Sequence, residues 1–131
     1  MKKKVIIISM MFFTLFAVDN AFTQTLPQLV NQYEQNCAVI EMNINAIVSS
    51  NPALNYLLTG NWQNSRDWTE LKESLDRDSQ IKRALERYDT ESYDGRIRQA
   101  ASVYRRGFNK LRDFLNRNNA SRYVPQWCPI N

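Results

Sequence analysis

The chain has 131 residues, of which 44% are hydrophobic and 23% are charged, and its formal net charge is +4. This length fits one domain with a modest core, and three glycines and four prolines argue against a turn-rich all-β fold or a low-complexity chain. With no histidine and only two cysteines, a zinc site would need carboxylates to complete it, so we predict no metal and no cofactor.

The first residues are typical of a secretory signal. Lysines at positions 2–4 precede an apolar run over residues 5–18. We predict a signal peptide of residues 1–21, cut after Ala21, with a cut after Thr23 as the alternative. The run is shorter than the roughly 20 residues that cross a bilayer, so no permanent membrane span is expected after cleavage. The mature protein is therefore predicted to be periplasmic or secreted.

A long helix is predicted to begin at Leu26, with Thr25 as its cap and Pro27 in its first turn. The apolar positions that follow are separated alternately by four and three residues, which indicates one buried stripe over about six turns. They are Leu26, Val30, Tyr33, Cys37, Ile40, Ile44 and Ile47. The helix is expected to end at Ser49 and Ser50.

A short second helix is predicted with Asn51 as its cap and Pro52 as its first residue, ending at a left-handed terminator at Gly60. Its inward-facing residues are expected to be Leu54, Leu57 and Leu58. The polar loop 61–64 then carries Trp62. This side chain could anchor a partner through its large rigid area or pack on the core, and the sequence leaves both interpretations open.

The third helical segment begins at Ser65 and has its apolar side at Trp68, Leu71 and Leu75. A second stripe, formed by Ile81, Leu85 and Tyr88, is rotated from the first. We therefore predict a kink or a short turn at residues 76–79.

A last long helix is predicted from about Tyr93 to about Asn118. Its apolar stripe is Ile97, Ala101, Tyr104, Phe108, Leu111 and Leu115. Because the two long helices share a period near 3.5 residues, near-antiparallel packing between them is expected. The fold class is therefore predicted as all-α, a small bundle of four to five helices.

Residues 22–131 are expected to form a single helical domain with an extended, apolar tail over residues 119–131. Two cysteines in an oxidising compartment favour a disulfide, so we predict a bridge between Cys37 and Cys128 that pins this tail to the first helix. Closing so long a loop would remove about 4 to 5 kcal/mol of unfolded-chain entropy.

The charge is distributed unevenly along the chain. Residues 95–122 hold eight basic residues and one acidic residue, a net charge of +7, whereas residues 66–94 hold six basic and nine acidic residues, a net charge of −3. Arg98, Arg105 and Arg112 recur every seventh residue and so share one side of the last helix, with Arg106, Lys110 and Arg117 further round. This basic side could pair with acidic helices of the same chain, remain solvated, or dock a partner.

No stretch matches a catalytic pattern, so we predict a non-enzymatic binding or accessory protein of the bacterial envelope. Inhibitor or immunity proteins, chaperones, and secretion or conjugation accessories share this kind of architecture. The predicted binding residues are Arg98, Arg105, Arg106, Arg112 and Trp62, and the partner is expected to be an acidic protein or an anionic envelope polymer.

Other functions remain alternatives to binding, among them a purely structural component that assembles with itself through the apolar tail. Export argues against nucleic acid as the partner, although arginines can neutralise phosphates. The enzymatic alternative is a small cell-wall-active enzyme that uses Glu41 as acid or base. The sequence does not fix the oligomeric state.

Overall fold

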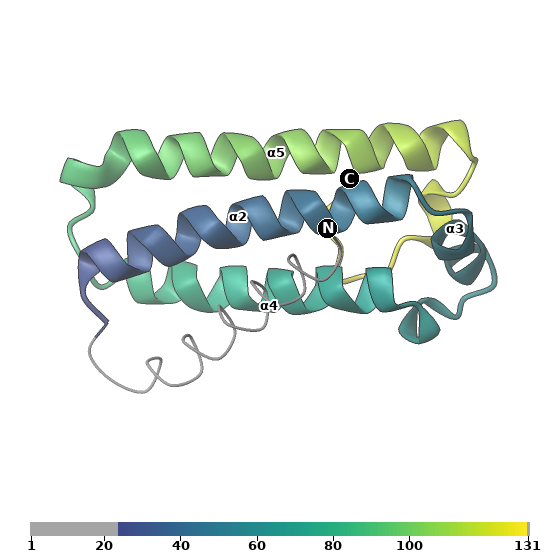
Figure 1. The fold of residues 1–131 in the computed structure, drawn as a ribbon, viewed down its shortest axis with the longest axis horizontal. Coiled ribbons are helices and arrows are strands. Elements are labelled where there is room, and N and C mark those ends of the chain that lie inside the picture. The colour runs from purple at the N-terminus through teal and green to yellow at the C-terminus, as the bar shows by residue number, and fades with distance from the viewer. Residues whose placement is uncertain (1–23, 131) are drawn as a thin grey trace.

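The computed structural model describes residues 24–130, so the predicted signal peptide and both cleavage sites lie outside the described residues. Every regular element in the described part is helical, and four of them are α-helices (Figure 1). They are α2 (Leu26–Val48), α3 (Asn51–Leu58), α4 (Arg66–Leu85) and α5 (Asp94–Arg117). Two short 3-10 turns lie between α-helices, η1 (Trp62–Asn64) and η2 (Glu91–Tyr93), and a third, η3 (Ser121–Tyr123), follows α5. The prediction of an all-α bundle is confirmed.

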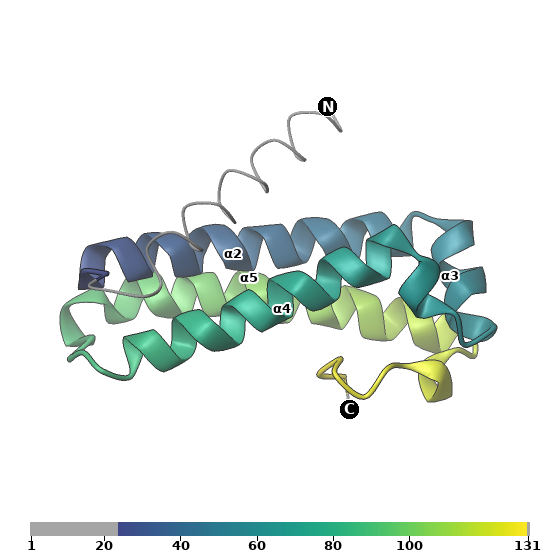
Figure 2. The same ribbon diagram turned by 90° about the horizontal axis from the view of Figure 1, so that it is seen from below.

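Helix α2 packs along both α4 and α5 and lies between them in the view of Figure 1, and α3 covers one end of the bundle (Figures 1 and 2). Helix α5 runs in the same direction as α2, since Arg96 meets Glu34 and Arg106 meets Glu41. The expected antiparallel packing of these two helices is wrong. Helix α4 makes the return pass along the bundle, so the helix that follows it runs parallel to α2. Among residues 24–130 no helix combines the length and apolar character that a bilayer crossing needs.

The start of α2 follows the sequence signals. The Thr25 backbone N–H donates to Gln28 Oε1 at 2.9 Å, and the Gln28 N–H donates back to Thr25 Oγ1 at 3.4 Å, which forms a capping box. The predicted stripe of α2 is buried from Val30 to Ile47.

Helix α3 is capped one residue earlier than expected, by Ser50, whose Oγ accepts from the Ala53 N–H at 3.2 Å. Gly60 follows with a φ of +75°, the left-handed conformation predicted for it. Of the three leucines expected to face inward, Leu57 is buried and Leu54 half-buried, whereas Leu58 is 37% exposed.

Helix α4 runs without interruption through residues 76–79, so the short turn predicted there as the alternative to a kink is wrong. The apolar stripe breaks there because the buried side of α4 becomes polar. Asn36 of α2 donates to the Ser74 carbonyl at 2.8 Å, and Arg77 Nε donates to Asn36 Oδ1 at 3.3 Å. Ser74, Arg77 and the neighbouring Asp78 are all buried. Hydrogen bonds to another helix therefore replace apolar packing at this level.

This polar layer separates two apolar clusters. The cluster at the α3 end contains Ile40, Ile44 and Ile47 of α2, Trp68, Leu71 and Leu75 of α4, and Phe108, Leu111 and Leu115 of α5. The cluster at the other end contains Leu29, Val30, Tyr33 and Cys37 of α2, Ile81 and Leu85 of α4, and Ala100 of α5. Each cluster thus draws on all three long helices.

The predicted disulfide is wrong. Cys37 and Cys128 are both free, buried thiols, and they belong to different apolar clusters rather than lying near each other. Trp127 holds the tail instead, because its ring packs edge-on against Trp62 at a centroid distance of 5.2 Å and against Trp68 at 6.3 Å. The tail does cover apolar surface, as expected, and aromatic packing attaches it.

Candidate binding surface on helix α5

The basic residues of α5 are positioned by its buried seam. Ala100, Phe108, Leu111 and Leu115 bury one side of the helix. Arg96, Arg106 and Lys110 lie beside this seam on the edge that meets α2. Arg98, Arg105 and Arg112 lie on the opposite flank and are exposed. The structure therefore divides the basic side of α5 into two rows with different surroundings.

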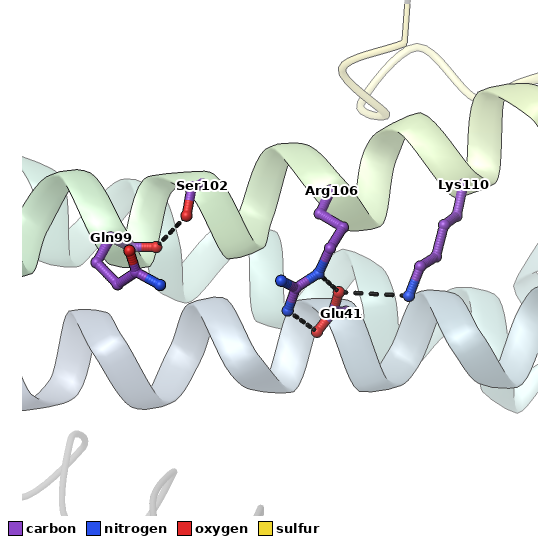
Figure 3. Close-up of polar contacts among 5 residues, drawn as sticks. All are labelled: Glu41, Gln99, Ser102, Arg106 and Lys110. Atoms are coloured by element: carbon purple, nitrogen blue, oxygen red, sulfur yellow. Dashed lines mark hydrogen bonds and ion pairs between the residues drawn. The ribbon is translucent and has the colours of Figure 1, made fainter.

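The first row is paired with carboxylates of α2. Arg106 donates to both oxygens of Glu41, with an Nε–Oε2 distance of 2.6 Å and an Nη2–Oε1 distance of 2.9 Å (Figure 3). Lys110 Nζ lies 3.5 Å from Oε2 of the same carboxylate. Two predicted members of the basic face, Arg106 and Lys110, are thus engaged within the fold.

A second ion pair lies about two turns earlier along α2 and nearly three turns earlier along α5. Arg96 donates to the two oxygens of Glu34 at 2.9 and 2.6 Å and to Asn31 Oδ1 at 2.7 Å. The hydrogen bond from Arg96 holds the pKa of Glu34 below its ordinary value, and the hydrogen bond from Arg106 does the same for Glu41, although burial opposes both shifts. The acidic partners of this row come from α2 and not from the acidic helix α4.

Arg98, Arg105 and Arg112 make no ion pair with any residue in the described range 24–130. Within that range the side chains of this row make one hydrogen bond, from Arg112 Nη1 to Asn109 Oδ1 at 3.3 Å, inside α5 itself. Since α5 is continuous, a spacing of seven residues separates successive arginines by about 10.5 Å along the helix axis.

Small polar residues fill the positions between these arginines. Ser102, Asn109 and Asn116 occur three or four residues from each arginine, so they share its side of the helix. The six residues form a band that we call the arginine stripe: Arg98, Ser102, Arg105, Asn109, Arg112 and Asn116. Ser102 Oγ is occupied within α5, where it donates to the Gln99 carbonyl at 2.6 Å (Figure 3). The stripe was visible in the sequence as a second 4–3 spacing beside the apolar seam.

Trp62 lies in η1 and is half-buried, with its ring against Trp127 and the apolar cluster at the α3 end. The structure therefore places it away from Arg98 and Arg105 in a packed aromatic group. Its use as a second partner contact stays a prediction.

Glu41 is poorly arranged for the acid or base role of the enzymatic alternative. An acid catalyst needs a raised pKa so that it carries a proton near neutral pH. Arg106 lowers the pKa of Glu41, and its two hydrogen bonds occupy both oxygens. The surroundings of this carboxylate are those of a structural ion pair.

A second polar group, around Asp78, was not predicted from the sequence. Its side chain is 5% exposed, with Oδ2 at 2.9 Å from Lys82 Nζ and Oδ1 without a hydrogen bond among the described residues. Tyr33 and Cys37 of α2 and Tyr104 of α5 lie close enough to interact with its charge. The break in the apolar stripe of α4 was the signal that could have indicated this group.

The thiol and hydroxyl groups near Asp78 are buried and remain protonated near neutral pH. Burial raises the pKa values of Cys37 and Tyr104 to about 12, so neither side chain ionises readily near neutral pH. Within residues 24–130 no three histidine, cysteine or acidic side chains are grouped as metal ligands would be. The exposed stripe on α5 is therefore the better candidate for a site.

Comparison with protein-family models, with curated proteins and with solved structures finds no match to the chain. The inference of function therefore depends on the surface that α5 presents.

Proposed function

We propose that the protein is an exported, non-enzymatic binding or accessory protein that holds an acidic partner against the arginine stripe. One observation carries the proposal. Arg98, Arg105 and Arg112 are exposed and have no carboxylate partner in the described part of the chain, whereas Arg96, Arg106 and Lys110 of the same helix are engaged in ion pairs with α2.

The energetics of binding favour this row over the paired one. A partner that reached Arg106 would have to compete with Glu41 for the guanidinium. At Arg98 and Arg105 no internal ion pair has to break. A guanidinium presents two parallel N–H donors to a carboxylate or phosphate, and the excess positive charge of residues 95–122 would speed the approach of an acidic surface.

Export is proposed from the leader sequence alone, since the cysteines do not supply the disulfide that would also have pointed to an oxidising space. In the bacterial envelope the available partners are acidic proteins and anionic polymers. Nucleic acid would also be attracted to the arginines, but it is not the expected partner in that compartment.

Crosslinking of the purified protein to an envelope fraction, followed by mass spectrometry, tests the proposal. The variant carries Arg98→Glu, Arg105→Glu and Arg112→Glu together. The control carries Arg83→Glu, Arg87→Glu and Arg117→Glu, three exposed arginines outside the stripe with the same total change of charge. We expect the stripe variant to lose the captured partner at unchanged helicity, and the control to keep it. Equal capture by both variants would remove the proposal.

A further inference from the structure

The arginine stripe repeats with the geometry of a helix surface. Its residues are separated by four, three, four, three and four positions, from Arg98 to Asn116. This is the 3.5-residue period of helices that pack side by side, and it runs along an uninterrupted part of α5. The seam of the same helix that packs on α2 has the same period. The exposed flank of α5 thus repeats the spacing of a helix–helix contact without having a helix against it in the described part of the chain.

Building on the proposed function, we infer that the partner presents an acidic α-helix that lies along α5, with carboxylates two turns apart opposite Arg98, Arg105 and Arg112. A helix with glutamates at every seventh position carries them at intervals of about 10.5 Å, the same spacing as the arginines. Each arginine can then bind one carboxylate through two hydrogen bonds without a change of the α5 backbone.

The residues between the arginines suit a neighbouring helix. Ser102, Asn109 and Asn116 are short, so they leave the arginines as the long side chains of the stripe. Ala101, half-buried between Arg98 and Arg105, is also small. A helix axis can approach to 8–10 Å where the side chains at the contact are small, and flanking charges then set the pairing.

Carboxylates within α5 do not already satisfy the stripe. Asp94 lies one turn before Arg98, and Asp113 follows Arg112 directly, yet neither forms an ion pair with an arginine of the stripe. Asp94 would repel an acidic residue beyond Arg98. The run of partner carboxylates is therefore expected to match three arginines and to end there.

The spacing requirement can be tested with synthetic helical peptides in a titration of the purified protein. One peptide carries three glutamates at intervals of seven residues. Its control has the same composition with glutamates at intervals of five, which places successive carboxylates about 140° apart around the helix. We expect the first peptide to bind at least tenfold more tightly at equal helicity. Equal affinities would overturn the helical partner and leave the proposed anion binding intact.

Anionic polymers provide the second arm of the test. Polyphosphate and coiled polyglutamate offer negative charges without a fixed two-turn spacing. Tighter binding of either polymer, per charge, than of the seven-spaced peptide would overturn the inference in favour of a polymer ligand. If no peptide and no polymer binds, the proposed function fails together with it.

Charge reversal tests the register directly. Arg105→Glu is expected to reduce affinity for the seven-spaced peptide at least tenfold, and replacement of the middle glutamate of the peptide by lysine is expected to restore most of it. Arg117→Glu, an exposed change on the same helix outside the stripe, should leave affinity within about twofold. Failure of the lysine peptide to recover binding would contradict the alignment of the two helices.

Discussion

Arg106 binds both carboxylate oxygens of Glu41, which joins the middle of α5 to the middle of α2. The pKa of Glu41 is lower in the folded protein than in the unfolded chain because Arg106 donates to the ionised form. The pair therefore stabilises the fold above the ordinary pKa of glutamate, and the contribution is lost as pH falls through the lower folded value. Glu41→Gln is expected to lower the thermal midpoint at pH 7 and to have a shrinking effect towards pH 3.

Thermal unfolding of both proteins from pH 7 to pH 3 measures this difference. Glu86→Gln is the matched control, because that exposed side chain has no hydrogen bond or ion pair in the described structure. A midpoint difference for Glu41→Gln that is the same at pH 7 and pH 3 would contradict the role of the ionised pair.

Gly107 allows the close approach of α5 to α2 beside this ion pair. A Cβ at this position would lie 3.4 Å from the Glu41 Cα and only 3.1 Å from Ile44 Cδ1, a fully buried side chain that would have to shift within the packed core. At Gly95 a Cβ would meet nothing within 4 Å. Gly95→Ala is therefore expected to raise the free energy of unfolding by up to about 1 kcal/mol through helix propensity. Gly107→Ala should instead lower it by about 1 kcal/mol, because the contact outweighs the same propensity gain.

Urea denaturation of the two alanine variants checks the pair, since both carry the same chemical change in the same helix. Equal stabilisation by both substitutions would show that the helices do not approach as closely at Gly107 as the structure has them.

The ionisation of Asp78 is predicted to change the stability of the fold with pH in the direction opposite to that of Glu41. Burial raises its pKa in the folded protein, and the hydrogen bond from Lys82 only partly opposes this. The folded state therefore loses stability relative to the unfolded chain as pH rises from the ordinary pKa of aspartate through the raised one. Besides Lys82 on its own helix, the side chains of Tyr33, Cys37 and Tyr104 surround the carboxylate, and all three remain protonated over this range.

Asp78→Asn removes the ionisation, so the thermal midpoint of the variant minus that of the wild type should increase from pH 4 to pH 7. Asp113→Asn, at an exposed position without an ion pair in the described structure, provides the comparison. A decrease over the same range would mean that Lys82 compensates the buried charge completely.

The features that were predicted correctly depend on residues close together in the chain. Thr25, Ser65 and Gly60 mark helix ends through local hydrogen bonds and backbone conformation, and these ends agree with the structure. The heptad row of arginines on α5 is likewise a property of spacing within one helix. What it could not predict was which of the basic residues would meet a carboxylate, because Glu34 and Glu41 lie more than sixty positions away from their partners.

The wrong predictions share one physical cause. Each concerned a feature that depends on contacts between residues far apart in the chain. The buried face of α4 is polar at Ser74 because the Ser74 hydroxyl accepts a hydrogen bond from Asn43 Nδ2 of α2 at 3.2 Å. A polar position in a stripe looks like a break when its partner is unknown. The continuity of α4 then decides that α5 runs parallel to α2. The number of cysteines in turn says nothing about whether Cys37 and Cys128 lie near each other.

The two thiols are expected to resist modification in the folded protein. Cys37 and Cys128 are buried, and burial raises the pKa of each to about 12, so little reactive thiolate is present near neutral pH. Iodoacetamide at pH 8 should therefore label neither cysteine in the native protein and both in guanidinium chloride, as read by intact mass. The thermal midpoint should not change with reductant. A loss of two mass units upon oxidation, together with a higher thermal midpoint, would show that the disulfide between Cys37 and Cys128 forms after all.

Trp127 is expected to supply much of the energy that holds the tail on the bundle. Its ring packs on Trp62 and Trp68, and its Nε1 has no hydrogen-bond acceptor among the described residues. Trp127→Ala should therefore lower the free energy of unfolding by about 2 to 3 kcal/mol, somewhat less than for a fully buried tryptophan. Trp127→Phe should recover more than half of this, since a second aromatic ring fills the site and no hydrogen bond is lost.

The neighbouring Trp68 separates ring packing from hydrogen bonding. Its Nε1 donates to the Ala53 carbonyl at 2.9 Å in the core, so Trp68→Phe loses a buried hydrogen bond in addition to ring volume and should be the more destabilising phenylalanine variant by about 1 kcal/mol. Gln126→Ala, an exposed change beside Trp127, should have an effect below about 0.5 kcal/mol. If Trp127→Ala has as small an effect as Gln126→Ala in urea denaturation, the tryptophans do not hold the tail on the bundle. The apolar surface that the tail covers would then be stable in water without the tail.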